Sequence, residues 1–475
     1  MNPEALKRIA AIVGLENLSA TTAERYAYST DAGIHRALPD AIARPKNAQE
    51  ISAIVKLANE LRFPVIPRGA GTALCGHSVA VRGGLIIDLQ RMNNVKEVHI
   101  PDLYVVVEPG VVHQALNDQL KKHGFFMPGP SSGNVATLGG MAATNASGDK
   151  ALKYGATRDY ILGMEAVLPT GEIVRLGSRT LKNSAGYQLD RLMVGMEGTL
   201  GIITELNLRV IPLPKASAVA VAVFDSLEKA GKCVADIISF PIIPSGLELM
   251  SRVCIEAVNK AVCLGLPEEE ALLLIEVDGS PSDVKEQIAQ VSEVCKSSGA
   301  KGVEFTHDPA RMEALWKGRK AMIPALSKYR EDLSAVMLAD DMAVPMSKVS
   351  AAVKAFQEIS DRYDIIVATY GHSGDGNLHT KVLMDPTKKE HWEQAEKAVI
   401  EIYEKVRELG GTVSGEHGVA ITKAPFFLKE RASSIGAMKA IKHALDPNNI
   451  MNPGKMMDWE EGFITHLRYR MEDLE

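Results

Sequence analysis

Hydrophobic residues recur at helical spacing over residues 51–61, and this pattern predicts an amphipathic helix. Asn47 is the predicted N-cap, with Glu50 three residues later as its capping-box partner. Mixed helical and strand-like patterns continue to about residue 215, which indicates an α+β domain with mixed sheets. The other elements expected here are an N-terminal helix and cover, two short strands and a further helix, at residues 1–35, 63–66, 85–87 and 112–124.

The pattern changes at residues 210–215, where two prolines interrupt it and predict a domain boundary. From about residue 216 to 415, strand-like runs alternate with helical patterns, which predicts one sheet covered by helices. The expected strands are at 219–224, 271–277 and 365–370, and the expected helices are at 226–239, 281–298 and 389–409.

Three stretches rich in glycine and small residues follow one another at 67–76, 129–148 and 195–201. Glycines at 69, 71 and 76 allow backbone conformations that point several N–H groups into one concavity, which suits a pyrophosphate. The second stretch offers small residues and hydroxyls that can line a long, flat ligand. Three such loops in order predict one extended nucleotide cofactor.

A nicotinamide-dinucleotide fingerprint fits this region poorly. It requires G-x-G-x-x-G at the start of a helix, with an acid about 20 residues later. Gly69 and Gly71 supply the first two glycines, but Leu74 occupies the third position. The first loop therefore does not match that class.

Several long motifs carry a family resemblance. PRGAGTALCG, GPSSGNVATLGGMAATNASG and GMEGTLGIITELNLRVIPLP resemble the FAD-binding domain of the vanillyl-alcohol oxidase fold. Their order, through DPNNIMNPGK at 446–455, is similar to the FAD-linked D-lactate dehydrogenase and glycolate oxidase large-subunit family over nearly the whole chain. The resemblance implies an FAD-binding domain at 1–215, an α/β cap (substrate) domain at 216–419 and a C-terminal segment at 420–475 that returns to the FAD domain.

The resemblance also implies which residues hold the cofactor. They share the small-residue loops, their flanks and the C-terminal motif: Pro67, Arg68, Gly69, Ala70, Gly71, Thr72, Gly76, His77, Pro130, Ser132, Gly140, Ala143, Thr144, Ser147, Gly148, Tyr154, Glu197, Gly198, Gly201, Ile202 and Asn452. Non-covalent FAD is expected, because Thr72 stands where several covalently flavinylated relatives carry histidine. Cys75 is interpreted as a small packing residue.

A second chemical centre is GHSGDGNLH at 371–379. If residues 374–377 form a turn between two strands, His372 faces His379 with Cβ atoms about 5 Å apart. Two imidazoles so placed can share a divalent ion at roughly 2.1 Å each. Spacing alone leaves open a plain hairpin whose histidines are only hydrogen-bonded.

SGEHG at 414–418 supplies a carboxylate and a further histidine. By the resemblance, His372, His379 and Glu416 bind a metal, and His417 is the catalytic base. Zinc is the expected ion, and manganese or iron would accept the same nitrogen and oxygen ligands.

Arg319, in LWKGRK at 315–320, resembles the family's substrate-carboxylate arginine. A guanidinium makes a planar, two-pronged contact with a carboxylate, which a 2-hydroxy acid presents. The alternative is a surface arginine on a basic helical turn. ADDMAVP at 339–345 matches the family only in part, and a substrate-binding lysine of some members is not evident there.

The expected activity is oxidation of a small D-2-hydroxy acid to the 2-oxo acid, with D-lactate first and glycolate second. A D-2-hydroxyglutarate dehydrogenase-like flavoenzyme, a metal-dependent hydrolase and a non-catalytic binding subunit are the alternatives. Electrons are expected to pass to a separate redox partner, which is an iron–sulfur subunit, an electron-transferring flavoprotein or a quinone. A complex or homo-oligomer is therefore expected.

Composition narrows the partners and the compartment. A chain of 475 residues, 46% of them hydrophobic, should divide into two or three domains. A net charge of −6 gives no global attraction to nucleic acid. No apolar run of transmembrane length and no secretory h-region is found. Five cysteines without a C-x-x-C pair argue against an iron–sulfur cluster or a disulfide framework. A cytoplasmic protein is expected, peripheral to the membrane only through a partner.

Overall fold

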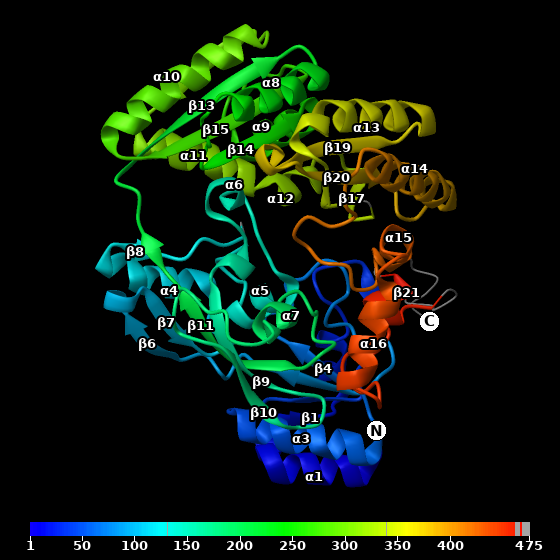
Figure 1. Ribbon diagram of the computed structural model, residues 1–475. Coiled ribbons are helices and arrows are strands. Elements are labelled where there is room, and N and C mark those ends of the chain that lie inside the picture. Colours follow the sequence, from blue (N-terminus) through cyan, green and yellow to red (C-terminus); the bar gives the residue numbers. More distant parts are fainter. Residues whose placement is uncertain (131, 339, 461–465, 468–475) are drawn as a thin grey trace. The chain divides into compact units, whose positions relative to one another are not determined.

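The computed structural model describes residues 1–130, 132–338, 340–460 and 466–467, which form two compact units (Figure 1). The first unit comprises residues 1–147, 156–213 and 416–475, and the second comprises 148–155 and 214–415. The contact-based divisions after 213 and 415 lie close to the expected boundaries at 215 and 419. A short excursion at 148–155 packs with the second unit, and the chain returns to the first unit at Glu416.

One sheet of the first unit has the strand order β1–β3–β5–β4, with bounds Leu18–Ser19, Ala41–Ala43, Leu85–Asp88 and Val65–Arg68. β3, β5 and β4 are parallel, and β1 is antiparallel to β3. Helices α1 (Pro3–Val13) and α3 (Ala48–Leu61) contribute to the core on this sheet. The sheet therefore presents the carboxyl end of β4 to the first glycine loop.

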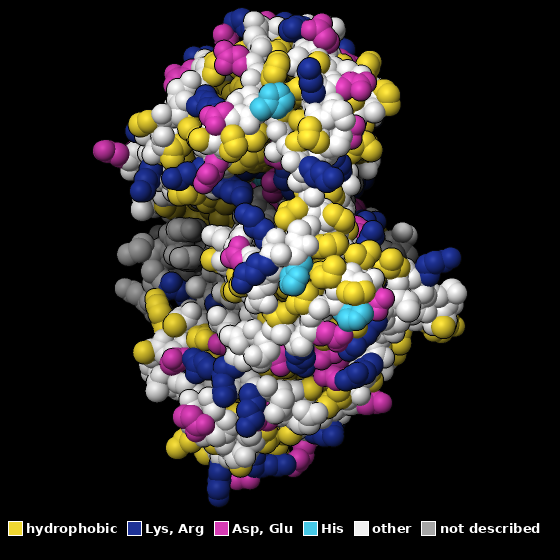
Figure 2. All heavy atoms as spheres, turned by 90° about the vertical axis from the view of Figure 1, so that its left-hand side faces the viewer, with side chains coloured by type: hydrophobic (Ala, Val, Ile, Leu, Met, Phe, Trp, Pro, Cys, Tyr) yellow, Lys and Arg dark blue, Asp and Glu magenta, His cyan; other side chains and the backbone are white. Residues whose placement is uncertain are grey.

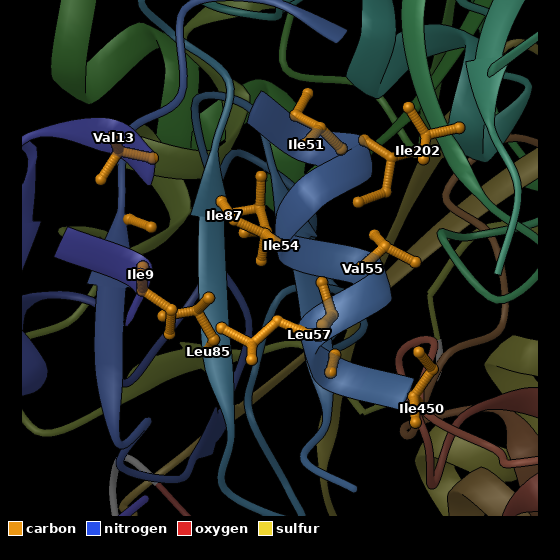
Figure 3. Packing of buried hydrophobic residues seen from close by; sticks show 14 of the residues in the cluster. Ile9, Val13, Ile51, Ile54, Val55, Leu57, Leu85, Ile87, Ile202 and Ile450 are labelled. Carbon is orange, nitrogen blue, oxygen red and sulfur yellow. The ribbon is translucent and has the colours of Figure 1, made fainter. Parts of the chain in front are cut away.

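The core under α3 explains why its apolar residues recur at helical spacing. Ile54 and Leu57 of α3 lie close to Leu85 and Ile87 of β5, and Ile9 of α1 packs beside them (Figure 3). Full burial of each such side chain contributes about 1.5–3 kcal/mol. The periodicity expected from the sequence is therefore the buried face of the helix.

The N-terminus of α3 differs from the predicted capping box in one contact. Asn47 Oδ1 accepts a hydrogen bond from the Glu50 backbone N–H at 2.8 Å, as an N-cap should. The Glu50 carboxylate, however, accepts from the Lys46 N–H at 2.9 Å and not from Asn47. The predicted reciprocal partner was therefore wrong by one residue, because the carboxylate bonds the N–H of the residue that precedes the N-cap.

A second, antiparallel sheet of the first unit has the order β10–β9–β11–β7–β6, with bounds Ile173–Gly177, Ile161–Val167, Ile202–Arg209, Tyr104–Val107 and Val95–His99. The other longer elements of this unit are α2 (Thr22–Ala27), α4 (His113–Leu120), α5 (Leu138–Thr144), α7 (Leu189–Met193), α15 (Ala424–Glu430) and α16 (Ile435–Leu445). Short strand pairs complete it: β2 (His35–Arg36) with β21 (His466–Leu467), and β8 (Phe125–Phe126) with β12 (Ile211–Pro212).

The second unit is built on one antiparallel sheet in the order β16–β13–β15–β14–β19–β20–β17, and β18 also pairs with β20. The strands, in chain order from β13 to β20, are Ala216–Phe224, Gly246–Ser251, Ala271–Gly279, Gly302–Thr306, Ser334–Val336, Met342–Ala343, Ile366–Gly371 and Asn377–Met384. All three strands expected from the sequence are present in it as β13, β15 and β19.

Helices cover both faces of this sheet. Side chains of α9 (Arg252–Val262), α11 (Pro309–Lys320) and α12 (Met322–Leu326) join one apolar cluster with one face of the sheet. α8 (Leu227–Ser239) and α10 (Pro281–Ser297) pack on β13 and β15 from the other side. The unit also contains α6 (Ala151–Tyr154), α13 (Val349–Tyr363) and α14 (Lys389–Glu408). α8, α10 and α14 confirm the three helices predicted from periodicity.

The surface is of mixed charge on the face that Figure 2 draws, where lysines and arginines are interspersed with acidic side chains. In the described ranges, no helix combines the length and apolarity needed to cross a membrane.

Candidate functional site

The three small-residue stretches converge in the first unit. A Cβ added at Gly69 would lie 2.2 Å from Thr137 Oγ1, which belongs to the second stretch. A Cβ added at Gly198, in the third stretch, would lie 3.1 Å from Pro67 Cγ. Because only glycine permits the first of these approaches, the stretches form one continuous surface.

Asn452 fastens the C-terminal segment to this surface. Its buried Nδ2 donates to the His77 carbonyl at 2.9 Å and to the Glu197 carbonyl at 2.8 Å. One side chain therefore joins the end of the first loop, at His77, and the third stretch to the 446–455 motif. Of the other predicted cofactor residues of this unit, Arg68 ends β4, and Ala70 and Thr72 follow it in the first loop. The rest lie before, along and after α5 and at the start of β11: Pro130, Ser132, Gly140, Ala143, Thr144, Ser147, Gly201 and Ile202.

Several polar atoms on this surface fit a ligand rich in hydrogen-bonding groups. Thr137 Oγ1 and His77 Nδ1 are buried and have no hydrogen-bond partner among the described residues. Gly71 and Gly76 have φ values of 70° and 90°, which side chains rarely adopt. Unsatisfied buried polar atoms are costly unless a ligand or water completes them. These residues therefore fit FAD.

Gly69→Ala should lower FAD affinity at least tenfold, because the added Cβ would displace Thr137 from the surface that receives the cofactor. Titration of the apoprotein with FAD, followed by flavin fluorescence, measures the effect. Gly436→Ala is the matched control, since nothing lies within 4 Å of that Cβ. Equal FAD affinity for both variants would contradict the assignment.

Glu197 holds the start of the returning segment. Its carboxylate accepts hydrogen bonds from the N–H groups of Val419 and Ala420, at 2.7 and 2.8 Å. Burial alone would raise the pKa of Glu197, but His77 and these two donors hold that pKa below its ordinary value. These contacts bind the start of the 416–475 segment to the first unit.

The turn that carries Glu416 and His417 lies against the cofactor loops. A Cβ added at Gly418 would lie 2.5 Å from His77 Nε2. Ser147 Oγ donates to Glu416 Oε2 at 3.4 Å. Within the first unit, the predicted base and the predicted carboxylate ligand are thus carried by the surface that fits FAD.

Two predicted cofactor residues, Gly148 and Tyr154, belong to the second unit. The Tyr154 hydroxyl donates to Asp278 Oδ1 at 2.9 Å, and Lys153 pairs with the same carboxylate. These contacts explain why the 148–155 excursion packs there, and they give Tyr154 a structural role within that unit.

The buried imidazole of His35, next to Gly76, is expected to make the first unit less stable in acid. Burial and then the charge of Lys455 lower the pKa of His35 to about 4. The unfolded chain binds the proton more readily between about pH 6.5 and 4, so stability falls as pH falls through that window. Wild type should lose about 2 kcal/mol more than His35→Asn between pH 7 and pH 5. Urea unfolding at both pH values tests this, with exposed His443→Asn as the control.

In the second unit, Glu248 on β14 links two residues singled out from the sequence. Arg319 Nε donates to Glu248 Oε2 at 2.6 Å, and His372 Nδ1 lies 2.5 Å from Glu248 Oε1. Burial alone would raise the pKa of Glu248, but Arg319 and His372 lower it to about 2. A charged glutamate inside an apolar strand was the available signal, and sequence reasoning missed it.

Arg319 is buried, with 8% of its surface exposed, so the surface-arginine alternative was wrong. Its guanidinium lies over the Tyr370 ring, 4.9 Å from the centroid. Only Nε is used by Glu248, and Nη1 and Nη2 make no hydrogen bond to any described residue. These two groups can therefore bind a planar anion.

The predicted strand register around the histidine pair was wrong by two residues. Tyr370, and not His372, pairs with His379. The turn occupies residues 373–376, one residue earlier than expected, because Ser373–Asp375 forms a 3₁₀ turn that ends at Gly376 with φ 82°. A two-residue shift preserves the face of the sheet. The His372 and His379 rings are accordingly still 5.3 Å apart between centroids.

Each of these histidines has a carboxylate at Nδ1. His379 Nδ1 lies 3.1 Å from Asp340 Oδ1, and Asp340 also pairs with the buried Lys381. His372 Nδ1 is on Glu248. A carboxylate at Nδ1 is the usual companion of a histidine that binds metal through Nε2. This arrangement fits a metal site. Ala339, which precedes Asp340 in the partly matching motif, lies outside the described residues.

Asp341 secures the chain next to the turn. Its carboxylate accepts from Asn377 Nδ2 at 2.9 Å and from Ser414 Oγ at 2.8 Å. Its carbonyl accepts from the Gly415 N–H at 2.9 Å. The motif at 339–345, which matched the family only in part, therefore orients both the histidine turn and the residues that directly precede Glu416.

Comparison with known proteins agrees with a chain made of an FAD-binding region and a C-terminal oxidase region. The family model of the FAD binding domain matches residues 39–177, and that of the C-terminal domain of FAD linked oxidases matches residues 213–456. Glycolate oxidase subunit GlcD of Bacillus subtilis is 39% identical over 454 residues, which are 95% of this chain and 96% of that protein. The mitochondrial D-lactate dehydrogenase (cytochrome) of Arabidopsis thaliana is 35% identical over 93% of this chain and 78% of its own length.

Among solved structures, p-cresol methylhydroxylase with substrate bound superposes with a TM-score of 0.78, at 17% identity and 96% coverage of both chains. The fold and its cofactor surface define a flavoprotein of the vanillyl-alcohol oxidase type. The chain belongs to the FAD-linked oxidase family and, within it, to the D-lactate dehydrogenase and glycolate oxidase group of FAD-dependent oxidoreductases.

Proposed function

We propose that this protein oxidises a small D-2-hydroxy acid, D-lactate first and glycolate second, to the 2-oxo acid. The observation that carries the proposal is the buried Arg319, which Glu248 holds by Nε while both Nη groups remain available for a carboxylate. The names of two relatives, a glycolate oxidase subunit and a D-lactate dehydrogenase, support the same substrate class.

Arg319 and His417 are proposed to act on different groups of the substrate. Arg319 binds the substrate carboxylate through Nη1 and Nη2, which fixes the orientation of the α-carbon. His417 accepts the hydroxyl proton as the α-hydrogen leaves, a general-base role that imidazole side chains commonly serve. Bound FAD supplies the acceptor for the hydride. We expect the FAD to be non-covalent, so acid precipitation should release it.

The metal ligands we propose are His372, His379 and Glu416, with zinc as the first choice and manganese or iron as alternatives. A bound divalent ion would lower the pKa of the substrate hydroxyl. Glu248 and Asp340 contribute by holding Nδ1 of the two histidines, which assigns Nε2 as the ligand atom in each.

A separate redox partner is proposed to reoxidise the flavin: an iron–sulfur subunit, an electron-transferring flavoprotein or a quinone. The most direct support is that the Bacillus subtilis relative is named as a subunit of an oxidase. The five cysteines form no C-x-x-C pair in the sequence, so we assign any iron–sulfur centre to the partner.

An anaerobic visible spectrum of the purified protein tests the proposal. A flavin spectrum that is bleached by D-lactate or glycolate, but not by L-lactate, is the expected result. Arg319→Met should keep the flavin spectrum and require a much higher substrate concentration for bleaching, because the carboxylate loses its partner. A protein without flavin, or one bleached equally by both lactate enantiomers, would overturn the proposal.

A further inference from the structure

Two cysteines face each other inside the second unit. Cys233 lies on α8 and Cys295 on α10, and these helices pack against each other and against β13 (Figure 1). Their Sγ atoms are 3.7 Å apart, and both side chains are fully buried. Motif analysis could not find the pair, because the two residues are separated by 62 positions.

We propose that Cys233 and Cys295 are a disulfide-forming pair, which a peroxide oxidises to a covalent link between α8 and α10. A disulfide has an Sγ–Sγ distance of about 2.05 Å, so the two sulfurs must approach by about 1.7 Å. Side-chain rotation on two adjoining helices supplies a movement of that size. The pair lies outside the residues assigned to oxidation of the hydroxy acid.

The contact between the two thiols suits disulfide formation. The Cys233 thiol donates to Cys295 Sγ at 3.7 Å, so loss of one proton leaves a thiolate beside a thiol. The thiolate is the nucleophile, and we write the step with Cys233 as the attacking residue. Its sulfur takes one peroxide oxygen to give a sulfenic acid and the first water. Cys295 sulfur then displaces that oxygen as the second water, so two thiol hydrogens and two electrons reduce one peroxide.

Access to the pair comes through the end of α10. Cys295 lies in the last turn of that helix, which ends at Ser297, and Gly299 beyond it has φ 90°. A partly buried hydrogen bond of 2.7 Å from Ser298 Oγ to Asp236 Oδ2 joins the end of α10 to α8 next to the pair. Opening of one terminal turn is a low-cost local motion. It would admit a molecule as small as hydrogen peroxide.

The test uses the full-length, FAD-loaded protein with Cys263→Ser throughout, because Cys263 is the exposed cysteine. Hydrogen peroxide treatment is followed by alkylation under denaturing conditions and peptide mass spectrometry. The alkylated cysteines should fall from four to two, with one cross-linked peptide containing Cys233 and Cys295. Dithiothreitol should restore four. The oxidised protein should also melt a few degrees higher than the reduced one.

Three variants make the result specific. Cys233→Ser and Cys295→Ser should each give no cross-link, whereas Cys254→Ser, at a buried site on α9, should leave the cross-link intact. The proposal is overturned if four alkylated cysteines survive peroxide. Conversion of Cys233 to a sulfinic acid without any cross-linked peptide would overturn it equally.

Discussion

Glu248→Gln should destabilise the second unit by about 3–5 kcal/mol, because it leaves a buried guanidinium without its counter-charge. Glu248 is fully buried, and Arg319 has no other ion-pair partner among the described residues. Glutamine has nearly the same size as glutamate. The loss of stability therefore comes from the missing charge and not from a cavity. Urea unfolding of apo wild type and variant measures the difference.

The same variant should lower kcat/KM for the hydroxy acid strongly, because Arg319 and His372 both lose the group that orients them. Glu276→Gln is the matched control. Glu276 lies on neighbouring β15, and its partner Lys150, 2.8 Å away, remains partly exposed and can turn to water. The control should lose less stability and keep activity. Equal losses in both variants would show that Glu248 has no special role.

His417→Ala should reduce kcat by about 10²- to 10⁴-fold, the range for removal of a general base. FAD content should be unchanged, since the His77, Glu197 and Asn452 contacts of the cofactor surface do not involve the His417 side chain. Stopped-flow reduction of the flavin by D-lactate isolates the step that His417 serves.

The control for His417 is His443→Ala, an exposed histidine on α16 of the same unit. Wild-type flavin reduction is expected for it. A His417→Ala protein that binds FAD and metal and still turns over at the wild-type rate would remove the base assignment. The neighbouring residue, Glu416, is a proposed metal ligand, so the metal content of the variant is measured in parallel. A lower rate at unchanged metal content reports loss of the base and not loss of the ion.

Local chemistry determined a large part of this protein in advance. The helix at α3, the cap at Asn47 and the strands β13, β15 and β19 follow from apolar periodicity and turn residues, which act within a few positions of the chain. The glycine loops were recognisable because only glycine allows approaches such as that of Gly69 to Thr137. The long sequence motifs then indicated the family, which the comparisons confirm.

Contacts between distant residues were decided only by the tertiary structure. Glu248 meets Arg319 across 71 positions and His372 across 124, so no local pattern could pair them. The register of His379 with Tyr370 depended on a 3₁₀ turn that moved the hairpin by one residue. Cys233 and Cys295 became neighbours through helix packing alone. Periodicity and glycine act locally, whereas charge pairing, register and burial depend on which distant elements the fold places side by side.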